Sequence, residues 1–208
     1  MTTTEPTADL DEEPTTPIDG RSARRQRNID AVVDATLSMF AEESMFPTME
    51  QVAQRSGLSL RSLYRYFADP ADLLDEAIRR TQEIGNEFSQ LDDPGEGPLE
   101  QRVADFAAMR LRLFERMAPV YRATMANAAR HPRILANQTR ARDRLRAQFE
   151  LQFAPELSAM SDERRQAALS AGDVLTQFDS LDFMRRHREL SIAATESVLV
   201  ASLTALLS

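Results

Sequence analysis

The sequence predicts an all-α protein of about nine helices, with a three-helix unit near the N-terminus and a helical bundle after it. Apolar residues recur every three or four positions from residue 21 onward, which is the spacing of one helix face. Glycine and proline concentrate at a few breaks, above all in residues 92–98, where two of each cannot continue a helix. The 208 residues include no cysteine, so a packed core must stabilise the fold without disulfides.

The ionisable side chains exclude several kinds of active site. All 25 basic residues are arginines, and the chain has two histidines but neither lysine nor cysteine. These absences exclude a Schiff-base lysine, a P-loop lysine, a thiol nucleophile and a zinc knuckle. The two histidines, His131 and His187, are too isolated to form a metal site. We therefore expect no enzymatic activity, no cofactor and no metal.

The net charge of −8 is distributed unevenly. Residues 1–20 carry six carboxylates and no basic residue, whereas residues 21–80 are neutral and residues 81–208 sum to −2. The first segment has few large apolar groups, so we predict a disordered acidic tail at 1–20. The sequence shows neither a secretory signal nor a membrane-spanning run, and we expect a cytoplasmic protein without membrane contact.

An amphipathic helix with a basic first turn is predicted for residues 21–43. Val32 and Phe40 fall on its apolar face, and Arg24 and Arg25 precede that face. Cations near a helix N-terminus oppose the helix dipole, so helix stability does not explain their position. A bound external anion explains it, and a solvated charged face is the alternative.

Two short helices follow, separated by a turn that contains glycine. Thr48 and Gln51 have the spacing of a capping box, which predicts a helix from residue 49 that ends before Gly57. Ser59 is a candidate N-cap for a second helix at residues 60–67. This is the helix-turn-helix pattern, and it suits a DNA-binding unit at residues 21–68.

The second short helix combines an apolar edge with a basic and aromatic edge. Leu63 and Phe67 lie on the first edge, and Arg61 lies on the second. An arginine fork at Arg61 suits guanine O6 and N7, whereas hydroxyls and other cations suit phosphates. The candidate phosphate contacts are Ser59, Ser62, Tyr64, Arg65 and Tyr66. Alternatively, both tyrosines pack the helix pair, and Leu60 contacts either a thymine methyl group or only its neighbours.

Residues 48–74 read TMEQVAQRSGLSLRSLYRYFADPADLL and resemble the DNA-binding domain of the TetR family of bacterial transcriptional repressors. The resemblance implies an all-α homodimer that binds a near-palindromic double-stranded DNA operator. It also implies that residues 69–208, with a connecting helix at 69–90, supply the dimer interface and an inducer cavity. The implied DNA contacts are Arg24 or Arg25, Thr48, Ser59, Ser62, Tyr64 and Tyr66, with Arg61 reading a base.

One position departs from the family pattern. Members commonly have a lysine that contacts phosphate where this chain has Pro70. Asp69 and Pro70 form a good helix start, because proline at the first helical position needs no N–H. The departure removes a cation and a backbone donor from the expected DNA surface.

The C-terminal region predicts further helices. We expect one that Pro119 interrupts before Tyr121, then helices at residues 134–153, 161–186 and 192–207. The last two carry apolar stripes with small residues, and we expect the homodimer to form through them, although intrachain packing is the alternative. The stripes are Leu169, Ala171, Gly172, Val174, Leu175, Phe178 and Leu181, then Val198, Leu199, Ala201, Ser202, Leu203, Ala205 and Leu206.

A largely apolar ligand pocket is the least specific expectation. Aromatic and methionine side chains suit an irregular apolar cavity, but each of them also suits an ordinary core. The candidate lining residues are Phe106, Met109, Phe114, Met117, Tyr121, Met125, Phe149 and Phe178. Tyr121 stands out because it brings a hydroxyl to an apolar helix.

Taken together, these features predict a sequence-specific DNA-binding regulator, a repressor released by a small, largely apolar inducer. The alternative is a helical interaction protein that retains the helix-turn-helix for structure and binds DNA weakly. Local charge favours the regulator, since residues 21–65 carry +2 with the arginines at the two predicted DNA-contacting segments.

Overall fold

The computed structural model describes residues 20–43 and 45–208. These residues form ten α-helices, the 3₁₀ turn η1 and the π-helical turn η2, and they form no strand. The all-α prediction is confirmed, with one helix more than the expected number. The segment predicted as a disordered tail lies outside the described residues, except that its last residue, Gly20, is the first residue of α1.

The N-terminal unit consists of three helices, and a fourth connects it to the rest. These are α1 (Gly20–Glu43), α2 (Met49–Ser56), α3 (Leu60–Tyr66) and α4 (Pro70–Phe88). Val32, Val52, Leu63 and Leu73, one from each helix, are fully buried in a common core. The helices therefore enclose one hydrophobic cluster, and α4 is part of it.

The caps predicted for α2, α3 and α4 are confirmed, although α3 ends at Tyr66 and α4 at Phe88, one and two residues before the predicted ends. Thr48 caps α2 in a complete capping box with Gln51, and Gly57 closes α2 in the left-handed conformation with φ 72°. Ser59 caps α3, accepting a hydrogen bond from the Ser62 backbone N–H. Asp69 caps α4 with Pro70 in its first turn. The turn between α2 and α3 is thus fixed by local chemistry.

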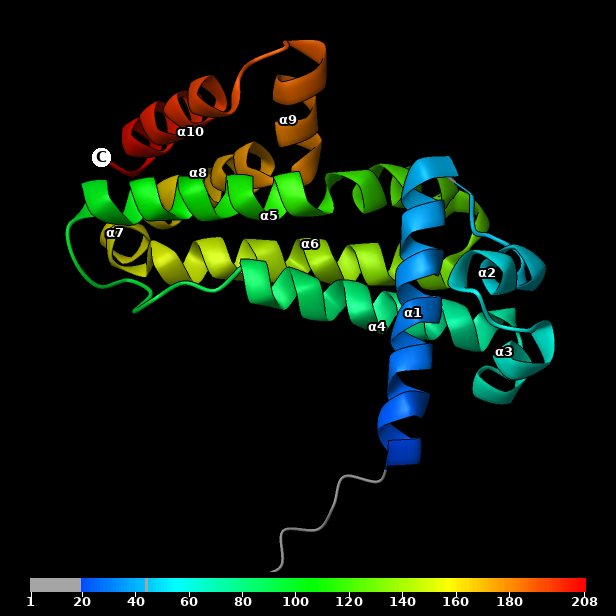
Figure 1. Cartoon of the computed structure of the whole chain (residues 1–208). Helices are drawn as coiled ribbons and strands as arrows, with labels where there is room; N and C mark the ends of the chain where they lie inside the picture. Colours follow the sequence, from blue (N-terminus) through cyan, green and yellow to red (C-terminus); the bar gives the residue numbers. More distant parts are fainter. Residues whose placement is uncertain (1–19, 44) are drawn as a thin grey trace, which may run out of the picture.

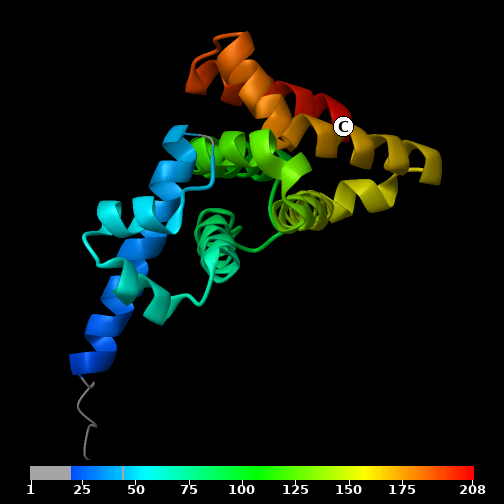
Figure 2. The same cartoon turned by 90° about the vertical axis from the view of Figure 1, so that its right-hand side faces the viewer.

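The C-terminal region is built around the long helix α5 (Leu99–Asn127), which leads through η1 (Ala128–Arg130) into α6 (Pro132–Gln152). The chain ends with α7 (Ala154–Ala159), α8 (Asp162–Thr176), α9 (Phe178–Asp182), η2 (Phe183–His187) and α10 (Ile192–Leu207). Helices α4, α5 and α6 run side by side, with α9 and α10 above them and α1–α3 at one end in Figure 1, and Figure 2 shows the same arrangement from that end. Edge-to-face packing of Phe106 on Phe149 and Phe153, with centroids 5.9 and 5.2 Å apart, forms part of the core.

The prediction that Pro119 interrupts a helix is wrong, because α5 continues through it. Proline removes one backbone hydrogen bond and costs about 3 kcal/mol in a helix interior. Here Met117, Ala118 and Ala123 around the proline are buried. Packing along the whole length of α5 outweighs the local cost.

The predicted single helix at residues 161–186 is also wrong. The chain leaves the helical conformation at Gln177 (φ −73°, ψ 155°) and starts again as α9 and η2. This break redirects the chain, so that Phe178 packs edge-to-face on Phe114 with centroids 5.5 Å apart. A further short helix, α7, follows α6 directly and was not expected.

Helix α8 approaches α6 closely at Gly172. A Cβ at this position would overlap the ring of Phe149. Gly172 and Leu169, which were expected in the dimer-forming stripe, are buried within the chain. The glycine is required by intrachain packing.

Candidate nucleic-acid interface and ligand cavity

The N-terminal half of α1 and the helix α3 lie on the same side of the molecule, where α1 projects beyond the helical bundle (Figures 1 and 2). Tyr66 at the end of α3 joins them. Its hydroxyl accepts hydrogen bonds from Asn28 Nδ2 on α1 at 3.0 Å and from Arg65 Nη2 at 3.1 Å. The Arg25 guanidinium lies 5.9 Å from the Tyr66 ring centroid. The hydrogen bond from Asn28, with that from Arg65, holds the pKa of Tyr66 below its ordinary value.

Several hydroxyls expected at the interface already have local partners. Ser59 Oγ accepts from the Ser62 backbone N–H at 3.1 Å and donates to Ser62 Oγ at 2.9 Å. Thr48 Oγ1 accepts from the Gln51 backbone N–H at 3.3 Å. Both Ser62 and Thr48 keep a hydroxyl hydrogen that can be donated to an anion.

The arginines of this face differ from those nearby in having no acidic partner. Arg24, Arg25, Arg61 and Arg65 form no ion pair with any carboxylate of the described residues. Each of the four is exposed. Their charges are therefore available to an external anion.

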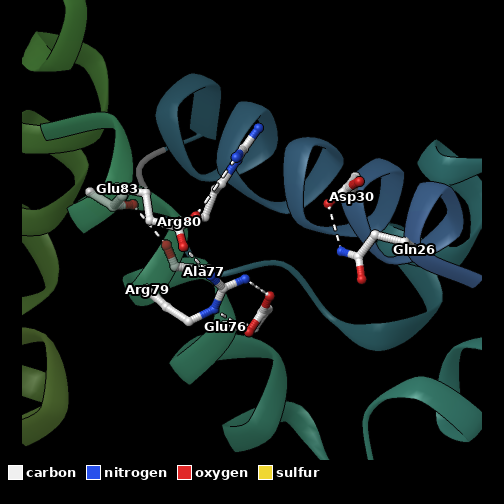
Figure 3. A network of polar contacts seen from close by, with 8 residues as sticks. Gln26, Asp30, Glu76, Ala77, Arg79, Arg80 and Glu83 are labelled. Carbon is white, nitrogen blue, oxygen red and sulfur yellow. Dashed lines mark hydrogen bonds and ion pairs between the residues drawn. The ribbon is translucent and has the colours of Figure 1, made fainter. Parts of the chain in front are cut away.

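Other arginines of the first four helices are neutralised within the chain. Arg55 pairs with Glu42 at 2.8 Å. On α4, Arg79 bridges Glu76 and Glu83, as Figure 3 shows beside the bond from Gln26 to Asp30 on α1. The hydrogen bond from Arg79 lowers the pKa of Glu76. Both arginines of α4, Arg79 and Arg80, are thus paired with carboxylates of the same helix.

The aromatic edge of α3 borders a shallow groove of about 490 Å³. Tyr64, 46% exposed, lines this groove together with Thr48 and Pro70. Leu60 is half-buried and packs against the core of the N-terminal unit. Tyr64 and Tyr66 therefore differ: the first faces solvent, and the second is tied to α1.

A second feature, a cavity of about 150 Å³, lies between α4, α5, α6 and the start of α9. Its apolar wall includes Leu113, Met117 and Phe178. Its polar wall comes mainly from amides on α4 and α6, where Gln82 Nε2 donates to Asn137 Oδ1 at 2.6 Å. The cavity therefore has one apolar and one hydrogen-bonding side.

A polar group on the C-terminal side of the cavity joins α5, α6 and α9. The Tyr121 hydroxyl donates to Asp179 Oδ1 at 2.6 Å, and Arg142 Nη2 donates to Asp179 Oδ2 at 2.7 Å. Burial, together with the hydrogen bond to Asp179, raises the pKa of Tyr121. Both oxygens of Asp179 are thus occupied.

Comparison with known proteins identifies the N-terminal unit. Residues 32–77 match the family model described as bacterial regulatory proteins, tetR family. The N-terminal unit therefore contains a domain of this family. No curated protein sequence matches the chain.

Solved structures of TetR-family regulators share the fold across most of this chain. A putative regulator from Rhodococcus sp. has a TM-score of 0.69 at 15% identity, covering 88% of this chain and all 100% of that one. A regulator from Streptomyces coelicolor has a TM-score of 0.66 at 18% identity, covering 87% and 80%. A putative one from Mesorhizobium loti has a TM-score of 0.57 at 20% identity, covering 88% and 96%. At these identities the likeness concerns the fold alone.

Three of the predicted ligand residues lie at the cavity between α4, α5, α6 and α9. Met117, Tyr121 and Phe178 line it. Phe114 packs behind Phe178 in the core. Met125 is 41% exposed, beside Gln138 and Arg142.

The remaining three predicted ligand residues do not line the cavity. Phe106, Met109 and Phe149 are buried in the main core cluster of α5, α6, α8 and α10. The physical reason is that periodic apolar spacing marks the inward face of a helix, whether a cavity or a side chain fills the space.

Sequence reasoning missed the polar wall of the cavity. Gln82, Asn137 and Gln148 are on helix faces that look solvent-exposed in the sequence. For the cavity surroundings, the sequence signal is Arg110, a charged residue within the apolar series of Phe106, Met109 and Leu113. In the structure the Arg110 side chain is fully buried, so this charge lies on an inward helix face and not on the surface.

The described part of the chain offers neither a membrane-spanning helix nor a cluster of metal ligands. Its helices include none long and apolar enough to cross a membrane. Its His, Asp and Glu side chains nowhere gather in the threes needed to hold a metal ion.

Proposed function

We propose that the chain is a sequence-specific DNA-binding transcriptional regulator, a repressor that a small ligand releases from its operator. The observation that carries this proposal is the set of unpaired arginines on one face of the helix-turn-helix unit. Arg24 and Arg25 on α1 and Arg61 and Arg65 on α3 have no described acidic partner, while the neighbouring Arg55 does.

Such a face suits the sugar-phosphate backbone on both sides of a major groove. Recognition helices enter the groove while neighbouring basic groups and hydroxyls contact the flanking phosphates. Arg61, exposed and without a described partner, has the freedom to fork onto a guanine edge. Tyr66 holds α1 against α3, so that the cations of both helices act together.

A homodimer suits the outer face of α8 and α10, which pack against each other. Val174 is 67% exposed and Val198 is 39% exposed, and Ala171, Ala201 and Ala205 beside them are exposed as well. Exposed apolar and small residues at helical spacing favour close packing with a second copy of the chain. Two copies would then present two α3 helices to two half-sites.

The cavity has a direct mechanical relation to the DNA-binding unit. Helix α4 supplies part of the cavity wall and begins at Pro70, four residues after α3 ends. Arg133 of α6 holds the start of α4 through Asp75 Oδ2 at 2.7 Å. A ligand that separates α4 from α6 therefore shifts α3, which supports release by an inducer.

The alternative, a helical interaction protein with weak DNA affinity, is favoured by the absence of a cation at Pro70. A gel-retardation titration separates the two. The test DNA is a palindromic sequence upstream of the chain's own gene or of a divergently transcribed neighbour, with scrambled DNA of equal length as control.

We expect a discrete complex with the palindrome at low salt and at least tenfold weaker binding to the scrambled DNA, corresponding to about 1.4 kcal/mol. A charge introduced on the outer face, Val198→Glu, should yield monomers in light scattering and weaken the complex. Equal retardation of both DNAs, or none, contradicts the regulator proposal.

A further inference from the structure

We propose that the cavity between α4, α5, α6 and α9 takes a small organic monoanion, a carboxylate whose apolar part is about the size of one aromatic ring. This inference rests on the proposed function, because it names the chemical class of that regulator's inducer. Two independent observations carry it: the size of the apolar part of the cavity, and a buried cation directly behind its wall.

The volume sets the size of the ligand. A cavity of about 150 Å³ accommodates a benzene-sized molecule. Leu113, Met117 and Phe178 provide apolar contacts, and Tyr121 packs edge-to-face on Phe178 with centroids 5.3 Å apart. The cavity thus favours a single ring or a short aliphatic chain.

The buried cation is Arg110 of α5, which has no exposed surface. Its Nη1 donates to Gln148 Oε1 at 2.8 Å and its Nη2 donates to the Leu145 carbonyl at 2.5 Å. Gln148 and Leu145 both line the cavity. The Arg110 Nε is buried without any hydrogen-bond partner among the described residues.

The charge of Arg110 is stabilised by neutral groups and not by a paired carboxylate. Its guanidinium lies 4.6 Å from the Phe106 ring centroid. Burial lowers its pKa to about 9, with Asp173 opposing the shift, so it remains charged at neutral pH. Asp173 itself is already bonded to Arg146 at 3.2 Å and to Gln177 at 2.5 Å.

An uncompensated charge in a low-dielectric interior acts over a longer distance than one in water. Arg110 contacts the cavity wall through the Gln148 side chain and the Leu145 carbonyl of α6, both of which line the cavity. An anion in the cavity supplies the missing counter-charge, whereas a cation there is repelled.

The groups on the open side of the cavity favour the same ligand charge. Arg144 lines the cavity and pairs with no described carboxylate, while Arg142 lines it and is shared with Asp179. Because both Asp179 oxygens accept hydrogen bonds, this acid does not provide a free site for a cation. The cavity lining therefore carries two arginines and one aspartate, with the buried Arg110 behind it.

Isothermal titration calorimetry of the full chain tests the charge preference with matched compounds. The acids are benzoate, phenylacetate and hexanoate, each compared with its own neutral amide, and benzylammonium serves as the cation. We expect at least one acid to bind at least tenfold more tightly than its amide. A smaller preference, tighter binding of benzylammonium, or no acid binding at about 10 mM overturns the proposal.

Variants then identify the source of the preference. Arg144→Gln and Arg110→Met should each reduce the ratio of acid to amide affinity. Arg140→Gln, an exposed residue of the same helix that does not line the cavity, should leave the ratio unchanged. Circular dichroism confirms folding, and Arg144→Gln decides the matter if Arg110→Met does not fold. The proposal is overturned if the ratio of acid to amide affinity is unchanged in whichever of Arg144→Gln and Arg110→Met are folded.

These measurements contain no DNA, so their failure is distinct from failure of the proposed function. If the operator is retarded but no acid is preferred, the regulator proposal is supported and the carboxylate proposal is rejected. If an acid is preferred but the operator is not retarded, the cavity binds carboxylates and the regulator proposal is rejected.

Discussion

The side-chain amide of Asn28 on α1 donates a hydrogen bond of 3.0 Å to the hydroxyl of Tyr66, the last residue of α3. The two residues are 38 positions apart, and the bond is partly buried. It fixes the basic half of α1 relative to α3. In the sequence, Tyr66 is a candidate phosphate contact, whereas in the structure it also orients two helices.

Replacing Tyr66 by phenylalanine should therefore affect both stability and DNA binding. The Asn28 amide loses its acceptor, and we expect the free energy of unfolding in urea to fall by about 0.5–1.5 kcal/mol. DNA affinity should weaken equally on specific and scrambled sequences. Tyr64→Phe is the control, because the exposed Tyr64 hydroxyl has no described partner. Equal stability of the two variants would show that the Asn28 bond is not stabilising.

Arg61 and Arg25 should respond differently to truncation. Arg61→Ala should relax specificity at about one base position per half-site by roughly 1–3 kcal/mol, because a base contact is lost. Arg25→Ala should weaken binding to all sequences alike, because a phosphate contact is lost. Competition titrations with single-base operator variants measure both. If the two variants lose equal affinity on operator and random DNA, Arg61 does not read a base.

The Pro70 position offers a gain of binding. Pro70 is exposed at the start of α4, after the Asp69 cap, so lysine fits there without breaking the helix. Pro70→Lys should tighten non-specific DNA binding and steepen its log–log salt dependence by up to about one unit. Gln90→Lys, which adds the same charge beyond the other end of α4, is the control. An unchanged slope in the salt titration refutes the prediction.

The Arg102–Glu156 ion pair should make stability depend on acid pH. The pair is mostly buried, with 7% and 15% of the two side chains exposed. The hydrogen bond from Arg102 lowers the pKa of Glu156 below its ordinary value. Glu156 thus contributes stability above its unfolded pKa of about 4.3, and this is lost as pH falls through the lower folded pKa.

Glu156→Gln should accordingly be less stable than the parent at pH 7, by about 1.5–3 kcal/mol, since a charge-assisted hydrogen bond is weakened. The difference should shrink as urea denaturation is repeated at lower pH, below about 4. Glu150→Gln, exposed on α6, should track the parent throughout. A difference that stays constant with pH argues against the ionised pair as its source.

The N-terminal unit could be predicted almost completely because its structure follows from short-range chemistry. The capping box of Thr48 and Gln51, the left-handed Gly57 and the Ser59 cap each act within four residues. Because these interactions join residues close together in the sequence, the helix caps could be predicted from the sequence alone.

The C-terminal region departed from prediction where long-range packing overrides local preference. Pro119 predicted a break that buried neighbours prevent, and nothing around Gln177 predicted the break that occurs there. Apolar spacing also failed to separate Phe149, which fills the core, from Phe178, which lines the cavity.

The sequence by itself determined the helical class, the helix-turn-helix and the residues that face outward from α3, because capping and helical period are local. Only the tertiary structure decided which arginines are neutralised and what surrounds the cavity. Arg55 pairs with a carboxylate 13 positions away, and Arg110 is buried against Gln148, 38 positions away. Ion pairing and burial depend on distances in space that close only when the helices pack.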